Sequence, residues 1–183
     1  MRTLFIITWF IILVGSFIAG MFLFDVFAPA EPAGPVVVNF EECIAAGNPV
    51  MESYPRQCRT AEGASFTEDI GNELEKDNLI RLESPRPGME VASPLEVRGV
   101  ARGYWYFEAS FPVRILDEQG TEIGVAPAQA QGEWMTEEFV PFKVSVPFAT
   151  STTATGYLVL EKDNPSGDPA RADFLKIPIR FKR

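Results

Sequence analysis

From residue 79 onward, hydrophobic and polar residues alternate in short runs. The clearest run covers residues 140–148, where apolar side chains occupy every second position. Similar runs cover residues 95–102, 111–115 and 175–181. A period of two residues is typical of strands that bury one face and expose the other. One-sided burial of this kind belongs to antiparallel sheets, because parallel strands are buried on both faces.

Turn-forming residues separate these runs, among them Pro87-Gly88, Gln119-Gly120 and Thr155-Gly156. The pattern predicts about seven strands, near residues 79–83, 94–101, 111–117, 121–127, 138–148, 156–162 and 173–182. Seven short strands in about 105 residues predict an all-β fold, an immunoglobulin-like antiparallel β-sandwich over residues 79–183. Prolines at positions 141, 147 and 178 indicate edge strands or bulges.

The N-terminal segment has a different pattern, with no charged residue between Thr3 and Phe24. A helix of these 22 residues would be about 33 Å long, which is enough to cross the hydrocarbon core of a bilayer. Arg2 precedes the run and Asp25 follows it, so the positive-inside rule places the N-terminus in the cytoplasm and the rest outside. We expect residues 1–27 to be a cytoplasmic tip and a single-pass signal anchor.

The alternative is a cleaved signal peptide, because residues 28–30 resemble a cleavage site. The apolar run is longer than the usual signal core of about 7–15 residues, which favours the anchor. Small residues spaced four apart, at 15 and 19 and at 16 and 20, would allow self-association of the helix. Chance is the simpler explanation of that spacing, since small residues are common in membrane helices. The proline-rich residues 28–35 then form a tether.

Residues 36–66 form a small separate module that contains both cysteines, Cys43 and Cys58. Thiols outside the membrane tend to be oxidised, so we expect a Cys43–Cys58 disulfide; free thiols, one of them paired across a dimer, are the alternative. A short helix is expected at residues 41–46, ended by Gly47. Residues 54–66 faintly resemble part of a Kazal-type protease inhibitor, a family that needs about six cysteines. Residues 67–78 are expected to form an acidic linker, either solvated and irregular or containing a short exposed helix.

Composition excludes several classes of function. The chain has 16 basic and 25 acidic residues, a net charge of -9, which disfavours nucleic-acid binding. It has no His, so His-based catalysis and His metal ligands are excluded. No carboxylate pair lies in a catalytic motif, and we expect neither an enzyme nor a cofactor. Oxygen-bearing residues gather at 163–168 and could hold Ca²⁺, but Asp, Asn, Ser and Gly are also the ordinary residues of turns.

Four consecutive aromatic residues occupy positions 104–107, and three of them, Tyr104, Trp105 and Tyr106, form the candidate binding patch together with Trp134. If Phe107 continues the buried alternation of the following strand, Trp105 is buried with it, and Tyr104 and Tyr106 face outward. Exposed aromatic side chains can stack on a glycan or contact a protein. The alternative is that they cover one end of the sandwich or pack on the cysteine module.

Residues 79–183 also resemble the immunoglobulin-like domain found in bacterial spore-germination proteins and in other exported bacterial proteins. The resemblance rests on segments that occur in order, at residues 84–88, 93–99, 105–108, 134, 139–142, 163–167 and 177–179. It implies a sandwich with a non-catalytic role in interaction or architecture outside the cytoplasm. A role in germination does not follow, because no companion domain is present.

Together these features predict a bacterial protein anchored in the cell membrane, with its C-terminal domain outside. We expect that domain to bind another protein or a cell-envelope glycan. The alternative is a structural spacer or accessory subunit of an envelope complex. Neither the partner nor the oligomeric state follows from the sequence.

Overall fold

A computed structural model describes residues 36–182 of the chain. The predicted membrane anchor and tether lie outside these residues, so the span and the topology stay predictions. Within residues 36–182, no helix has the length and apolar character needed to cross a bilayer. The chain divides into two units, Met1–Val38 and Asn39–Arg183.

The cysteine module consists of one short helix and a small antiparallel sheet. Its elements are α2 (Phe40–Ala45), β1 (Val50–Met51), β2 (Gln57–Arg59) and β3 (Ser65–Thr67), with the strands in the order β1-β2-β3. Asn39 begins the helix, because its side-chain oxygen accepts a 2.8 Å hydrogen bond from the backbone N–H of Glu42. Gly47, with φ 78°, ends the helix as predicted, because glycine adopts this left-handed conformation without steric cost.

The predicted disulfide is confirmed. Cys43 on α2 is bonded to Cys58 on β2, with a Cα–Cα distance of 6.0 Å, and both side chains are fully buried. The bond therefore fastens the helix of the module to the middle strand of its sheet.

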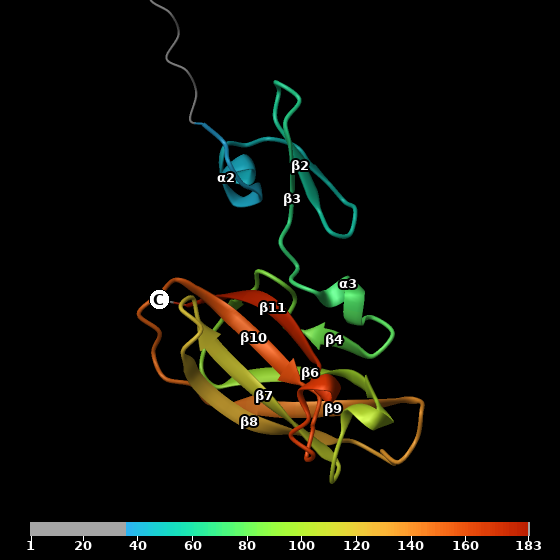
Figure 1. Cartoon of the computed structure of the whole chain (residues 1–183). Helices are drawn as coiled ribbons and strands as arrows, with labels where there is room; N and C mark the ends of the chain where they lie inside the picture. Colours follow the sequence, from blue (N-terminus) through green and yellow to red (C-terminus); the bar gives the residue numbers. More distant parts are fainter. Residues whose placement is uncertain (1–35, 183) are drawn as a thin grey trace, which may run out of the picture. The chain divides into compact units, whose positions relative to one another are not determined.

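Eight strands follow in the larger part of the chain (Figure 1). They are β4 (Ile80–Ser84), β5 (Glu90–Val91), β6 (Leu95–Arg102), β7 (Ser110–Asp117), β8 (Glu122–Ala130), β9 (Phe139–Val146), β10 (Thr155–Glu161) and β11 (Phe174–Phe181). Three single-turn helices accompany them, α3 (Glu73–Lys76), η1 (Gly103–Trp105) and η2 (Pro169–Arg171). Every strand predicted from the alternation is present, and the two-residue β5 is an addition.

The strands form one hydrogen-bonded sheet in the order β4-β6-β9-β8-β7-β10-β11-β5. All neighbours are antiparallel except β11 and β5, which are parallel. The all-β antiparallel prediction is confirmed, whereas the division into the two sheets of a sandwich is not. β8 is paired with β9 only through Gln129 and Ala130, so two residue pairs connect the two halves of the sheet.

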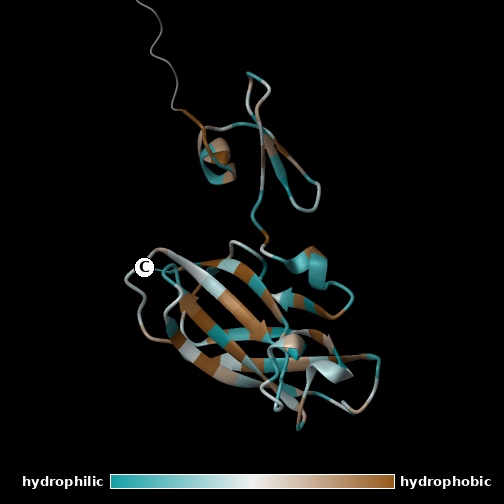
Figure 2. Ribbon diagram, viewed as in Figure 1, coloured by the Kyte–Doolittle hydropathy of each residue, from teal (hydrophilic) through white to brown (hydrophobic). Residues whose placement is uncertain are grey.

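One hydrophobic core receives side chains from both ends of this strand order. Phe111 on β7 and Phe142 on β9 meet edge to face, with ring centroids 5.0 Å apart. The sheet must therefore curl so that its inner face encloses the core. Along β9 the buried and exposed residues alternate as the sequence predicted, and Figure 2 shows hydrophobic and hydrophilic bands alternating along the strands.

The prediction of edge strands from the prolines is wrong, because β9 with Pro141 and β11 with Pro178 both lie inside the strand order, and Pro147 follows the end of β9. Pro178 on β11 is paired with Tyr157 of β10, and its carbonyl accepts the N–H of Gly88 at 2.8 Å. Pro141 lies on β9, an interior strand, which the sequence did not predict. Its carbonyl accepts the N–H of Gln131, a residue beyond the end of β8. The missing N–H of Pro141 thus lies where the neighbouring strand has already ended.

Candidate functional site

Three loops meet at one end of the region that starts at residue 79 and contains β4–β11, which we call the β-domain. Residues 103–109 connect β6 to β7, residues 131–138 connect β8 to β9, and residues 162–173 connect β10 to β11 (Figure 1). The backbone N–H of Gly103 donates to the carbonyl of Glu138 at 3.1 Å, and the N–H of Asp163 donates to the carbonyl of Trp105 at 3.0 Å. These hydrogen bonds tie the three loops together, and we call this surface the loop end.

Gly103 allows the first two loops to approach each other closely. A Cβ atom at this position would lie 1.9 Å from the carbonyl oxygen of Thr136 and 2.3 Å from that of Trp134. No side chain fits at such distances, so glycine is required for this backbone contact.

The aromatic residues do not continue the strand alternation, because η1 turns the chain at residues 103–105. Trp105 is fully buried, as predicted, but Tyr106 is also buried, with 4% of its surface exposed. Phe107 is 42% exposed. The predicted orientations of Tyr106 and Phe107 are therefore wrong, because the 3-10 turn at residues 103–105 advances the side chain by about 120° per residue, whereas a strand advances it by about 180°.

Tyr106 has a structural role within the core. Its hydroxyl donates a 2.8 Å hydrogen bond to the carbonyl of Val140, and its ring packs edge to face on Phe111 with centroids 5.1 Å apart. Burial raises the pKa of this hydroxyl above its ordinary value. Trp105 and Tyr106 are therefore unavailable to a ligand, and they pack inside the β-domain rather than on the cysteine module.

The loop end nevertheless exposes large apolar side chains. Tyr104 is 48%, Phe107 42% and Met135 75% exposed, and Trp134 is half-buried against the core. Of the four predicted patch residues, only Tyr104 is exposed, and the ammonium of Lys162 lies 5.8 Å from the centre of its ring. Met135 was missed, although its position in a polar loop, between Trp134 and Thr136, was the available signal.

A strained turn supports the exposed ring of Phe107. Glu108 and Ala109 have φ values of 48° and 62°, in the left-handed region that non-glycine residues rarely occupy. Phe107 and Ser110 close the turn with two backbone hydrogen bonds of 3.0 Å. Each such residue costs on the order of 1 kcal/mol, and conformations of this kind often accompany functional sites.

The loop that could have held Ca²⁺ uses its side chains in turns. The amide of Asn164 donates to the carbonyl of Asp168, and the hydroxyl of Ser166 donates to the side-chain oxygen of Asn164 at 2.6 Å. The carboxylate of Asp168 caps η2 through the N–H of Ala170. Among residues 36–182, no three His, Cys, Asp or Glu side chains are grouped as metal ligands. Turn chemistry therefore accounts for this loop.

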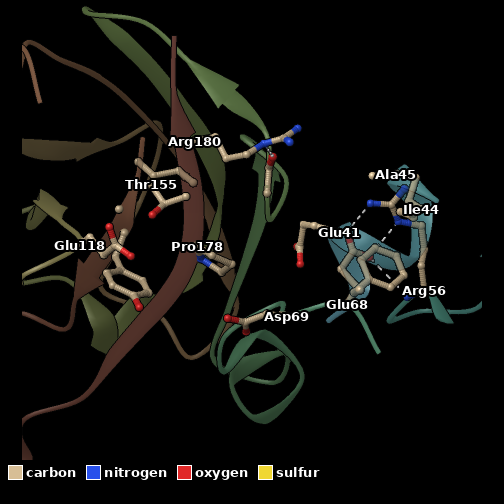
Figure 3. A pocket seen from close by; sticks show the side chains of 15 residues that line it. Glu41, Ile44, Ala45, Arg56, Glu68, Asp69, Glu118, Thr155, Pro178 and Arg180 are labelled. Carbon is tan, nitrogen blue, oxygen red and sulfur yellow. Dashed lines mark hydrogen bonds and ion pairs between the residues drawn. The ribbon is translucent and has the colours of Figure 1, made fainter. Parts of the chain in front are cut away.

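A hollow elsewhere in the Asn39–Arg183 unit is lined by α2 residues and by residues of β10 and β11 (Figure 3). Its two arginines are already engaged. The guanidinium of Arg56 donates to Glu68 at 2.9 Å and lowers the pKa of that carboxyl, and Arg180 donates to the carbonyl of Gly88 at 2.9 Å. Nothing in its lining suggests a particular ligand.

Glu73 is the buried charged residue of the described chain, with 8% of its surface exposed. The hydroxyl of Tyr54 donates to its carboxylate, and the guanidinium of Arg86 lies 3.7 Å from the other carboxylate oxygen. The same guanidinium stacks over the Tyr54 ring at 5.0 Å. Burial, then the hydrogen bond to Glu73, raises the pKa of Tyr54. These contacts give Glu73 a structural role.

Comparison with known protein families gives a match, which lies in the β-domain. Residues 79–168 match the model of a family described as the immunoglobulin-like domain of bacterial spore germination. The match confirms the family resemblance seen in the sequence, and it ends within the third loop, before β11. No curated protein and no solved structure matches the chain.

Proposed function

We propose that this chain, which carries the immunoglobulin-like domain of bacterial spore germination at residues 79–168, is an exported bacterial protein that binds a partner protein through its loop end. An immunoglobulin-like domain of this family suggests an exported protein with a binding or accessory role. The uncharged run from Thr3 to Phe24 supports a membrane anchor with the C-terminal domain outside. The Cys43–Cys58 disulfide supports an oxidising compartment.

The observation that carries the proposal is the exposure of Tyr104, Phe107 and Met135 on two loops that are held together. Aromatic residues and Met are enriched in the buried centres of protein interfaces. The backbone hydrogen bonds between the loops restrict their backbone before binding, so less backbone freedom is lost when a partner binds.

A protein partner suits this surface better than a glycan. Sugar rings stack best on a flat, accessible aromatic face. The two tryptophans near the loop end do not expose such a face to solvent. Trp105 is fully buried, and Trp134 is half-buried against the core. The flexible Met135 side chain adapts instead to an irregular apolar surface.

The role is proposed to be non-catalytic. The chain lacks His, and the polar side chains of the 163–168 loop are engaged in turn hydrogen bonds. The competing possibility is a spacer or accessory subunit, which the burial of Trp105 and Tyr106 in the domain's own core favours. The two possibilities differ in whether the exposed loop residues touch another protein.

Site-specific photocrosslinking on intact cells distinguishes them. The photoreactive residue p-benzoylphenylalanine replaces Tyr104, Phe107 or Met135, one at a time, in the full-length protein. Met89, which is 49% exposed and precedes β5, serves as the control position. We expect the same discrete adduct from the three loop positions and none from position 89. Equal labelling from all four positions, or no adduct at all, would contradict the binding role.

A further inference from the structure

We infer that the partner presents an apolar patch surrounded by lysine and arginine residues. This inference rests on the proposed binding role of the loop end and adds the chemistry of the partner. It comes from the charge of the loop end, where Tyr104, Phe107 and Met135 are exposed; we call these three side chains the apolar centre.

Acidic residues are concentrated in the three loops. Residues 79–183 contain 14 acidic and 12 basic residues, so the β-domain as a whole is nearly neutral. The three loops hold seven of those acidic residues and only two of the basic ones. The loop end thus has a net charge of -5, while the remainder of the domain has a net charge of +3.

Part of this acidic charge is neutralised within the chain. Asp173 lies 2.6 Å from the ammonium of Lys76, Asp168 lies 3.7 Å from the guanidinium of Arg171, and Glu138 lies 3.9 Å from that of Arg102. The other four acidic residues of the loops have no ion-pair partner among residues 36–182; they are Glu108, Glu133, Glu137 and Asp163.

These free carboxylates flank the apolar residues in the sequence. Glu108 follows Phe107 directly, in the turn that is kept in the left-handed conformation. Glu133 and Glu137 lie two residues before and after Met135, and the carboxylate of Glu133 accepts the N–H of Met135 at 3.1 Å. Phe107 and Met135 thus each lie within two residues of carboxylates that have no ion-pair partner among residues 36–182, and we call Glu108, Glu133 and Glu137 the acidic rim.

An interface of this composition favours a basic partner for a physical reason. Rim charges contribute little to affinity, but they steer encounter and raise the association rate about tenfold or more when the opposite surface is cationic. The same carboxylates repel anionic surfaces, including phosphate-bearing envelope polymers. Charge complementarity thus selects a protein surface with Lys or Arg around an apolar patch.

A displayed library of random dodecapeptides tests this inference on the full-length protein in detergent. We expect the selected peptides to combine apolar residues with Lys or Arg and to compete with one another. The variants F107S and M135S should weaken binding of the best peptide about tenfold, mainly through faster dissociation. The matched variant M89S should leave binding unchanged.

Charge reversal then distinguishes the contribution of the acidic residues to binding from that of the apolar residues. The triple variant E108K/E133K/E137K should lower the association rate constant about tenfold at low salt, and added salt should shrink the difference. E118K, at an exposed acidic position outside the three loops, should change it less than twofold. Circular dichroism verifies that each variant is folded.

The outcomes distinguish the inference from the function on which it rests. Peptides that need Phe107 but lack basic residues, or that ignore the triple reversal, would overturn the inference and leave the binding surface intact. Peptides indifferent to both F107S and M135S would contradict the binding surface itself. A selection that yields no peptide for the loop end would also overturn the inference.

Discussion

The β-domain and the cysteine module are held together by different means. The β-domain encloses a continuous core with side chains such as Phe111, Phe142 and Leu158, each at most 2% exposed. In residues 39–67 the buried hydrophobic residues are Phe40, Cys43 and Cys58 alone. Two of these three are the cysteines themselves, so the module relies on a covalent bond where the β-domain relies on packing.

This difference follows from the number of residues in each region. Apolar burial contributes roughly 25 cal/mol per Å², and about 30 residues cannot bury enough area to offset the conformational entropy lost on folding. A disulfide instead lowers the conformational entropy of the unfolded chain, so that less entropy is lost on folding. We therefore expect the β-domain to be sensitive to its core and the module to be sensitive to its bond.

The largest expected effect is that of Val144→Asp on the β-domain. Val144 lies on the inner face of β9 and is 7% exposed. A buried, unpaired carboxylate should cost several kcal/mol, which approaches the whole stability of about 5–15 kcal/mol expected for a domain. Urea unfolding, followed through the fluorescence of buried Trp105, should show a large loss or no cooperative transition at all.

Lys143→Asp is the matched control on the opposite face of the same strand. The Lys143 ammonium lies 3.3 Å from Glu96 in an exposed ion pair, so its reversal should cost about 1 kcal/mol or less. If Lys143→Asp proved as damaging as Val144→Asp, packing of the inner face would not be what holds the β-domain together.

The second effect concerns the disulfide. Replacing both cysteines, as C43A/C58A, removes a bond that closes a sequence separation of 15 residues, worth about 3 kcal/mol in the chain-entropy model. We expect residues 39–67 to become sensitive to protease, while the urea transition of the β-domain stays in place. Loss of both regions together would contradict their separate stabilisation.

The same contrast explains what the sequence revealed about the fold. The seven strands were predictable, because a regular strand repeats its exposure every two residues and burial is nearly complete on one side. The two-residue β5 was not, since so short a segment cannot show a period. The single continuous sheet could not be predicted either. It depends on the pairing of Gln129 and Ala130 with β9, and no pattern along one strand indicates that pairing.

The candidate site was predictable only in its location. The aromatic run at 104–107 marked the correct loop, but the orientation of each ring depended on η1, which interrupts the alternation just before Tyr106. Gly103 was the local signal for that turn, and its meaning depends on Thr136, more than 30 residues away. Contacts between distant loops are tertiary information, and no local pattern encodes them.

The smallest effect tests whether side-chain contacts supplement the disulfide in the module. Glu68 accepts hydrogen bonds from the side chain and the backbone N–H of Arg56, and the Arg56 guanidinium lies over the Phe40 ring at 5.3 Å. Glu68→Gln keeps the shape but removes the charge. At neutral pH we expect a loss of about 0.5–1 kcal/mol, because half of the Arg56 side chain is exposed to solvent. Glu52→Gln, at an exposed position of the same module, should have almost no effect.

The pH dependence of this loss gives the sharper test. The hydrogen bond from Arg56 lowers the pKa of the Glu68 carboxyl in the folded state, so folding favours its ionised form. The contribution is therefore complete above the unfolded pKa of about 4.3 and disappears as the pH falls through the lowered folded value. Hydrogen exchange of the β2 amides should show wild type and Glu68→Gln differing at pH 7 and converging in stronger acid. A difference that persists unchanged at low pH would mean that the shape of the Glu68 side chain, and not its charge, stabilises the module.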